Sequence, residues 1–502
     1  MNRARRGLPA AILLLLGAGG LAAATLAQRV DAVLASTPVA RGAFWGIQAV
    51  DLASGKTLYE LNPNRFFVPA SNTKLFTTAL ALTALGPEAT FQTRVLAAGP
   101  PDPDGVLRCS LRLLGGGDPN LSARAVPYEK SASSGDPLAA IRDLAGQVAA
   151  KGVKRITGDI VGDDTWYVWQ PYAEGWMLDD PATGYGAAVS ALAIGDNSQT
   201  LSIRPGAAVG ELAALVLNPA LEYYRIENRV RTVAADGDRN IHADRLPGSR
   251  TLRVWGTIPV RGRGEEVALG IDDPALYAAL ALRSALEDRG IAVDGAAVAE
   301  HLFPEDVADL KRAPAPPADA AGVELARRES APLVECLRVV DKVSQNLHAE
   351  MMLRAVGRAR RNLGSREAGL EEMGAFLAEA GIPAGAYDLV DGSGMARLNL
   401  ATPAAVVRLL RYMYASPAWR DFLPLLPVGG EDGTLAARFT GAAQAGRVHA
   451  KTGALAHVAA LSGYAQRPNK TWVAFSILVN NYDGEPAEIR KAMDRVCALI
   501  ME

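Results

Sequence analysis

The fold is decided by the stretch Val68-Pro69-Ala70-Ser71-Asn72-Thr73-Lys74-Leu75, in which a serine stands three residues before a lysine. An apolar run without Gly or Pro follows over residues 75–85 and stops at Gly86-Pro87, which predicts a helix that begins near Ser71. Because residues i and i+3 share a helix face, the Lys74 amine can reach the Ser71 hydroxyl and take its proton. An isolated Ser-x-x-Lys pair, however, is more often an ordinary solvated helix start.

Two later stretches favour a catalytic role for this pair. They are Ser344-Gln345-Asn346, beside a predicted helix start, and Lys451-Thr452-Gly453, on a predicted strand. Each alone fits a helix cap or a strand end. The ordered set Ser-x-x-Lys, Ser-x-Asn, Lys-Thr-Gly is typical of penicillin-binding proteins and class A β-lactamases, which carry Asp where Gln345 stands.

Further short stretches indicate which family among these proteins the chain resembles. They are Asn346-Leu347-His348-Ala349-Glu350-Met351, Asp391-Gly392-Ser393-Gly394, Leu426-Pro427-Val428-Gly429 and Asp432-Gly433-Thr434. With them the chain resembles the class C low-molecular-mass penicillin-binding proteins, the D-alanyl-D-alanine carboxypeptidase/endopeptidase family. The resemblance covers essentially the whole mature chain and is strongest in residues 40–90 and 330–480.

The resemblance implies acyl transfer on peptidoglycan peptides through a serine ester, without a cofactor and with β-lactams as inhibitors. Ser71 would attack the carbonyl between two D-alanines, and Lys74 would accept its proton. Ser344 would pass a proton to the leaving amine. Asn346 would hold the substrate amide and orient Lys74.

The remaining implied residues bind the substrate. Lys451 and Thr452 suit its terminal carboxylate, and Gly453 lets the backbone approach closely. The backbone N–H groups of Ser71 and Ala454 would form the oxyanion hole. Ala454 departs from the family, in which Ser or Thr is frequent at this position, so one hydroxyl for the carboxylate is lost.

Arg397 matches a position that lines the family's pocket for the peptide side chain. The stretch Asp163-Asp164-Thr165-Trp166 could add to the same wall. For both, simple surface packing is an equally good interpretation.

The expected fold class is α/β, with a transpeptidase/β-lactamase-like catalytic domain and two nested insertions. Strands at 44–50 and 56–61 would join strands at 448–452, 458–465 and 471–480 in one antiparallel sheet flanked by helices. We expect the catalytic domain at 28–90 and 322–502, a second domain at 91–200 and 266–321, and a small, mostly β third domain at 201–265. The Pro/Ala stretch at 313–318 indicates a boundary.

Composition excludes several function classes. The chain has 502 residues with a net charge of −2, which argues against a nucleic-acid binder. Its five histidines and its three cysteines, Cys109, Cys336 and Cys497, show no metal-ligand spacing. No metal is therefore expected. The oligomeric state and any cysteine pairing stay open.

The N-terminus has the pattern of an export signal over residues 1–27. Arg3, Arg5 and Arg6 precede an apolar run that ends in small residues. This predicts a periplasmic or extracellular enzyme, which would be membrane-associated if the segment stayed uncleaved.

Three other functions compete with the peptidase. A serine β-lactamase of class A would need a glutamate-bearing loop, and no convincing Glu-x-x-Leu-Asn stands between Asn346 and Lys451. A Ser-x-x-Lys esterase would leave Lys451 without a carboxylate partner. A non-catalytic wall-binding protein should have lost some of these residues.

Overall fold

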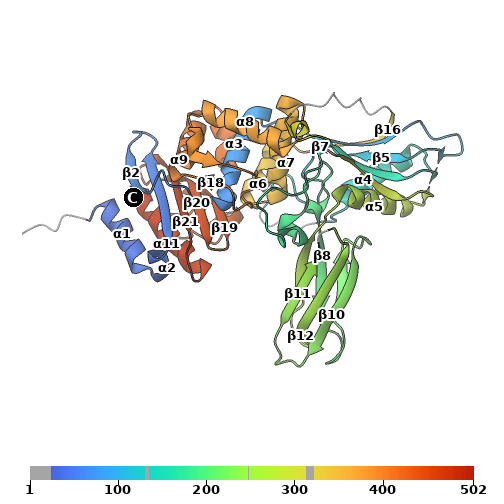
Figure 1. Cartoon of the computed structure of the whole chain (residues 1–502), viewed down its shortest axis with the longest axis horizontal. Coiled ribbons are helices and arrows are strands. Elements are labelled where there is room, and N and C mark those ends of the chain that lie inside the picture. The colour runs from blue at the N-terminus through green and yellow to red at the C-terminus, as the bar shows by residue number, and fades with distance from the viewer. Residues whose placement is uncertain (1–23, 130–134, 247, 312–321) are drawn as a thin grey trace, which may run out of the picture.

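The computed structural model describes residues 24–129, 135–246, 248–311 and 322–502 (Figure 1). Most of the expected export signal and the Pro/Ala stretch lie outside these residues. Helix α1 (Leu26–Ser36) contains residue 27, the expected end of the signal, and packs on the last helix, α11 (Pro486–Met501). No helix in the described ranges is long and apolar enough to span a bilayer.

One five-stranded sheet joins the two ends of the chain. Its order is β19 (Val448–Leu455), β20 (Val458–Gln466), β21 (Trp472–Asn480), β1 (Phe44–Asp51) and β2 (Thr57–Leu61). Every neighbouring pair is antiparallel, and Ile47 faces Ile477 across the β1–β21 register. The sheet predicted from the two distant groups of strands is therefore confirmed.

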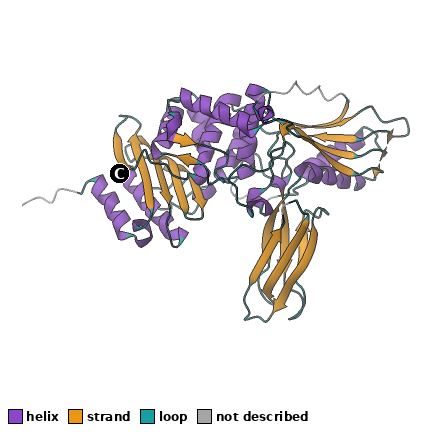
Figure 2. Ribbon diagram, viewed as in Figure 1, coloured by secondary structure: helices purple, strands orange, loops and turns teal. Residues whose placement is uncertain are grey.

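Helices cover both faces of this sheet (Figure 2). One face carries α1, α2 (Pro38–Arg41) and α11, whose stripe of Ile489, Met493, Val496 and Ile500 is buried. The other side carries α3 (Thr73–Leu85), α6 (Leu333–Lys342), α7 (Asn346–Arg361), α8 (Arg366–Glu379), α9 (Pro403–Ala415) and α10 (Trp419–Phe422), with the short strands β17 (Tyr387–Asp388) and β18 (Leu400–Ala401).

Helix α3 is the most deeply buried of these helices, which explains its almost uninterrupted apolar sequence. All residues from Thr73 to Leu82 are buried, and each fully buried Leu or Phe contributes about 1.5–3 kcal/mol. The helix ends at Gly86, whose φ of +83° is open to glycine at little cost. This burial fixes the position of Lys74 in its first turn.

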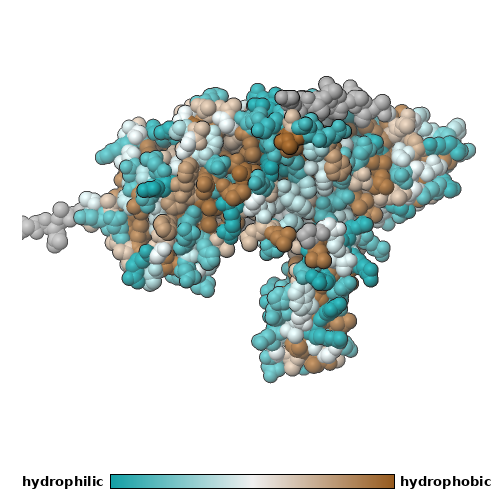
Figure 3. Space-filling model, in the orientation of Figure 1, coloured by the Kyte–Doolittle hydropathy of each residue, from teal (hydrophilic) through white to brown (hydrophobic). Residues whose placement is uncertain are grey.

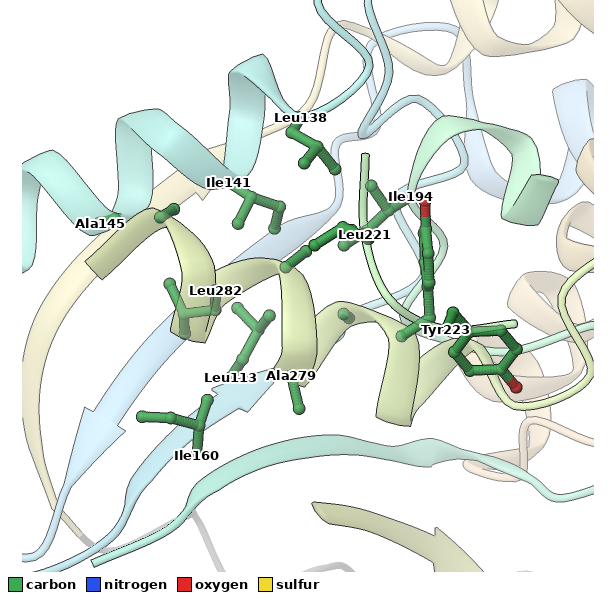
Figure 4. Close-up of a cluster of buried hydrophobic side chains, with 14 of the residues drawn as sticks. Leu113, Leu138, Ile141, Ala145, Ile160, Ile194, Leu221, Tyr223, Ala279 and Leu282 are labelled. Carbon is green, nitrogen blue, oxygen red and sulfur yellow. The ribbon is translucent and has the colours of Figure 1, made fainter. Parts of the chain in front are cut away.

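A second five-stranded sheet lies in the inserted part, in the order β15-β7-β5-β3-β16. Its strands are β3 (Gln92–Ala97), β5 (Leu111–Leu114), β7 (Ile160–Val168), β15 (Ala297–Leu302) and β16 (Val323–Glu329). Helices α4 (Ala139–Ala150) and α5 (Pro274–Glu287) pack on it through the cluster drawn in Figure 4, which includes Ile141, Ile160 and Leu282. A small sheet joins β4 (Val106–Leu107), β6 (Arg155–Ile156) and β14 (Ala292–Val293).

The boundary expected at residue 322 is misplaced. Strand β16 starts at Val323 and pairs with β3 along its length, so it belongs to the inserted sheet. The Pro/Ala stretch at 313–318, expected as a boundary, lies outside the described residues. A strand that returns to its sheet after a long excursion leaves no local mark in the sequence.

The smallest region is all-β and projects from the molecule (Figure 1). It pairs β8 (Ser198–Arg204), β9 (Ala214–Asn218) and β13 (Glu265–Gly270) in one sheet, and β10 (Arg225–Val233), β12 (Thr251–Pro259) and β11 (Asn240–Arg245) in another. Its sheets begin before residue 201 and end after 265, so the expected range of 201–265 is a few residues too short at each end. Strand β11 was not expected, because Asn-Ile-His-Ala-Asp-Arg is largely polar.

Candidate active site

The first turn of α3 carries the expected nucleophile and base. Ser71 lies in the 3-10 helix Ala70–Asn72 that leads into α3, and it is half-buried. Lys74 is fully buried, and its Nζ lies 3.0 Å from Ser71 Oγ. Ala70, just before the serine, has a φ of +47°, a strained backbone for a non-glycine residue. The pair predicted from the Ser-x-x-Lys spacing is thus in direct contact.

Three oxygens surround the Lys74 ammonium. Besides Ser71 Oγ, Nζ donates to Asn346 Oδ1 at 2.7 Å and to the carbonyl of Ser393 at 2.6 Å. An ammonium group has three N–H donors, and the site supplies one acceptor for each. When Lys74 is neutral, two N–H groups can stay on Asn346 and Ser393, which leaves the lone pair directed at the Ser71 hydroxyl.

Burial sets the protonation of Lys74. It lowers the pKa of this amine to about 8, while the charges of Asp391, Glu350 and Asp341 oppose the shift. An amine with such a pKa is partly neutral near pH 7–8, where a general base is useful.

The Lys-Thr-Gly stretch lies on β19, directly beside the nucleophile. The Lys451 Nζ donates to Ser344 Oγ at 2.8 Å, and the Lys451 carbonyl accepts from Asn72 Nδ2 at 3.0 Å. A Cβ added to Gly453 would lie 2.9 Å from the Pro69 carbonyl oxygen, which explains the need for glycine there. Three parts of the chain therefore meet around Ser71, and the outermost two, at Asn72 and Lys451, are 379 positions apart.

Burial also lowers the pKa of Lys451, and the nearby charge of Lys74 lowers it further. Two ammonium ions share one buried site, so loss of the Lys74 proton removes this repulsion. Deprotonation of one lysine thus favours the cationic form of the other.

The Ser-x-Asn stretch lies at the junction of α6 and α7. Ser344 has a φ of +65°, a turn that directs its hydroxyl to Lys451, and Asn346 is the first residue of α7. Asn346 Nδ2 donates to the Tyr185 carbonyl at 2.9 Å, which connects the inserted part to the site. The amide therefore contacts Lys74 on one side and the inserted domain on the other.

The outer residues of the site are placed less tightly. Thr452 Oγ1 lies 2.8 Å from Thr434 Oγ1, and Ala454 is exposed. Arg397 is half-buried and donates to the Ala456 carbonyl at 3.2 Å, while its backbone N–H reaches the Gly175 carbonyl. Arg397 therefore borders the end of β19, beside the inserted segment.

The acidic stretch Asp163–Trp166 does not join this site. Asp163 pairs with Arg112, and Asp164 accepts from Ser190 at 2.8 Å and contacts His301. Trp166 lies under the Arg358 guanidinium. These side chains serve the packing of β7, and Asp163 and Asp164 are buried there instead of lying on the surface.

Sequence reasoning missed the loop that fixes the Ser393 carbonyl on Lys74. Glu350, which is fully buried, accepts from the N–H groups of Gly392 and Ser393 at 2.8 and 2.9 Å. Asp391 accepts from the N–H of Gly394 at 2.7 Å. Asp391-Gly392-Ser393-Gly394 was visible as a family stretch, but nothing in the sequence placed its carbonyl on the base.

The cysteines do not contribute to this site. Cys109, Cys336 and Cys497 are unpaired, and burial raises the pKa of the Cys336 and Cys497 thiols. Across the residues that the structure describes, no group of three or more His, Cys, Asp or Glu side chains could hold a metal ion.

The fold and the Ser71–Lys74–Lys451 cluster place this protein in the class of serine hydrolases. The family model of the D-Ala-D-Ala carboxypeptidase 3 (S13) family matches residues 26–499, and the chain belongs to this family. It is 36% identical over 478 residues to the D-alanyl-D-alanine carboxypeptidase of an Actinomadura species, with 93% of this chain and 83% of that protein covered. The resemblance to class C low-molecular-mass penicillin-binding proteins is confirmed.

Solved structures share the fold. Penicillin binding protein 4 (dacB) from Haemophilus influenzae matches with a TM-score of 0.78 at 23% identity, covering 93% of this chain and 97% of that one. The same protein complexed with a novel β-lactam matches with a TM-score of 0.75. The predicted α/β transpeptidase-like architecture is therefore confirmed.

Proposed function

We propose that this serine hydrolase acts on peptidoglycan peptides, as a carboxypeptidase that removes the terminal D-alanine, an endopeptidase that cuts crosslinks between peptides, or both, and that β-lactams acylate the same serine. The observation that carries the proposal is the Lys74 amine held 3.0 Å from Ser71 Oγ by two further acceptors. It supplies a base of suitable pKa that is already aligned with the nucleophile.

Acylation follows from this geometry. Ser71 Oγ attacks the carbonyl carbon between the two D-alanines while its proton moves to Lys74. The tetrahedral oxyanion then lies between the backbone N–H groups of Ser71 and Ala454. The C–N bond breaks, and the proton that Lys74 accepted from Ser71 passes through the Ser344 hydroxyl to the leaving amine, which returns Lys74 to its neutral form. Ser344 accepts its hydrogen bond from Lys451 at 2.8 Å, so its own O–H remains available for donation.

Substrate binding uses the cationic edge of the site. Lys451 attracts the terminal carboxylate, and the Thr452 hydroxyl donates to it. Arg397 borders the space for the peptide side chain. Water, activated by Lys74, then hydrolyses the Ser71 ester and restores the free enzyme, whereas a ring-opened β-lactam stays attached.

We also propose that the enzyme works outside the cytoplasm. The basic and apolar start of the sequence supports export. Cell fractionation, with N-terminal sequencing of the exported form, tests this; recovery of the intact N-terminus from the cytoplasmic fraction would contradict it.

Labelling with a fluorescent penicillin tests the function. We expect covalent labelling of the wild type and none of Ser71→Ala, with the label released slowly. Rapid release would instead indicate a β-lactamase, and labelling of another residue would overturn the assignment of Ser71. Digestion of purified muropeptides, with separation of the products, distinguishes trimming of D-alanine from cutting of crosslinks.

A further inference from the structure

The projecting β region carries an exposed tryptophan in the middle of a sheet face. Trp255 lies on β12, the central strand of the β10-β12-β11 sheet, and it is 39% exposed. Of the seven tryptophans in the chain, the others are all buried or half-buried. Because Val254, the preceding residue, is fully buried in the core, Trp255 points to the outer face of the sheet. Part of a large apolar ring is therefore left in contact with water.

Polar side chains on the neighbouring strands surround this ring. The strand register places Arg229 of β10 and His242 of β11 directly opposite Trp255. The His242 ring stacks beside the indole, with the two centroids 5.4 Å apart and an interplanar angle of 19°. Arg253, two positions earlier on β12, donates to both carboxylate oxygens of Asp244 at 2.9 Å. These contacts hold the side chains around the indole in defined orientations.

A small hollow opens beside the indole. It has a volume of about 200 Å³ and is lined by Arg229, Asp244, Arg253, Val254 and Trp255. Pockets for drug-sized ligands have about 300–1,000 Å³, so this hollow suits a single ring. Its lining supplies an aromatic surface, guanidinium donors and a carboxylate acceptor. A ring with one apolar face, and with donors and acceptors around its edge, would match all three.

The charges of this sheet face restrict the class of ligand. Its outward side chains include four arginines and only two carboxylates, namely Arg225, Arg229, Arg231, Arg253, Glu227 and Asp244. This excess complements a ligand that carries negative charge. No outward position in 225–231, 240–244 or 251–257 holds an aliphatic residue, which argues against a protein partner. The net charge of −2 for the whole chain argues against a nucleic acid.

We propose that this face binds the glycan strand of peptidoglycan, with one sugar ring stacked on Trp255. The apolar face of a pyranose ring can lie flat on the indole. Its hydroxyl and acetamido groups then accept from Arg229 and donate to the free lone pairs of Asp244. The carboxylates of the peptides that branch from the glycan complement the arginines.

This inference rests on the proposed function, which makes peptidoglycan the substrate. The β region projects away from the catalytic sheet (Figure 1), so a glycan bound there does not contact Ser71. Such binding would hold the enzyme on the wall and raise the local concentration of peptides at the active site.

Binding to glycan strands freed of their peptides by an amidase tests the proposal. Isothermal titration calorimetry with Ser71→Ala measures this binding separately from catalysis. Trp255→Leu should bind at least about tenfold more weakly, since it keeps an apolar side chain but loses the aromatic surface. Trp255→Tyr should stay within about threefold, because a phenol ring preserves stacking. No binding of peptide-free strands, or equal binding by the Leu and Tyr variants, would overturn the proposal.

Val216→Ala is the matched control. Val216 is 58% exposed on β9, in the other sheet of the same region, and its substitution should not change glycan binding. A loss as large as that of Trp255→Leu would show that the region as a whole is disturbed, which would overturn the assignment of the face.

Arg229→Gln decides if the Trp255 variants do not fold. The Arg229 side chain is 75% exposed, so the substitution leaves the core intact. It should weaken glycan binding by about threefold or more, because one guanidinium beside the indole is lost. Unchanged binding would overturn the proposal.

Single-stranded DNA is the competing ligand. Tighter binding of a DNA oligomer than of glycan, with the same dependence on Trp255, would overturn the choice of glycan. Penicillin labelling separates this inference from the proposed function. A wild type that is not labelled at Ser71 contradicts the function, whereas normal labelling without glycan binding contradicts only the role of Trp255.

Discussion

The active site and the projecting β region use charged residues in opposite ways. Lys74, Lys451 and Glu350 are fully buried, and the side-chain hydrogen bond from Lys74 to the Ser393 carbonyl spans 319 residues. In the β region, Arg253 pairs with Asp244 only nine residues earlier, across the exposed face of β11 and β12, where their side chains are 47% and 42% exposed. The visible surface of this region in Figure 3 is mostly hydrophilic, with few hydrophobic side chains.

The comparison shows that the reactivity of a charged side chain depends on its burial. In water an ion pair contributes only about 0–1 kcal/mol to stability. In the buried site the same groups lose solvation, so their protonation depends on one another and on each neighbouring dipole. Substitutions of charged residues in the active site should therefore change the acylation rate by orders of magnitude, whereas those in the β region should leave it unchanged.

Lys74→Ala should show the largest loss. Without its base, Ser71 keeps its proton, and acylation by penicillin should fall by about 10²–10⁴-fold or more. Stopped-flow acylation measures this, while circular dichroism checks that the protein stays folded. An acylation rate close to wild type in a folded variant would remove Lys74 as the base.

Gly394→Ala should damage the site without removing any functional group. Gly394 has a φ of +79°, and an added Cβ would lie 1.9 Å from the Ala70 carbonyl oxygen, next to the nucleophile. Displacement of Ala70 should misalign Ser71 and lower acylation by about a hundredfold. Gly385→Ala is the control, since no atom lies within 4 Å of its added Cβ. Equal effects of the two variants would contradict this account.

The pH dependence of acylation should follow Lys74. Its folded pKa of about 8 lies below its ordinary 10.5, so the base is increasingly protonated as the pH falls below 8. We expect kcat/KM to fall about tenfold per pH unit on the acidic side. The unfolded chain binds the extra proton between pH 8 and 10.5, so this group makes the folded state relatively more stable as the pH rises through that window. A flat profile from pH 6 to 8 would contradict the assignment.

Arg253→Ala should have the smallest effect. Its exposed pair with Asp244 should contribute less than about 1 kcal/mol to the free energy of unfolding, and acylation should not change. Val254→Ala, the next residue on the buried side of β12, is the contrast and should cost about 2 kcal/mol or more. Thermal unfolding of both variants measures the difference; a larger effect of Arg253→Ala would reverse the comparison.

The sequence revealed the parts of the fold that depend on local pattern. Strands β20 and β21 and helix α3 were expected near their observed bounds, because alternation, caps and terminators act over a few residues. The assignment of β16 failed, since its partner β3 lies more than 200 residues earlier. Strand β11 was missed because it is largely exposed, so its sequence is mostly polar and lacks the apolar alternation by which strands are recognised.

By itself the sequence determined the chemistry: a serine and a lysine one helical turn apart, and two further stretches that suit an amide and a carboxylate. Only the tertiary structure decided that the Ser393 carbonyl completes the contacts of Lys74, and that Glu350 holds the loop that carries this carbonyl. The physical reason is that a motif records which groups are present. Burial and distance, which set their protonation and alignment, exist only after residues hundreds of positions apart have packed together.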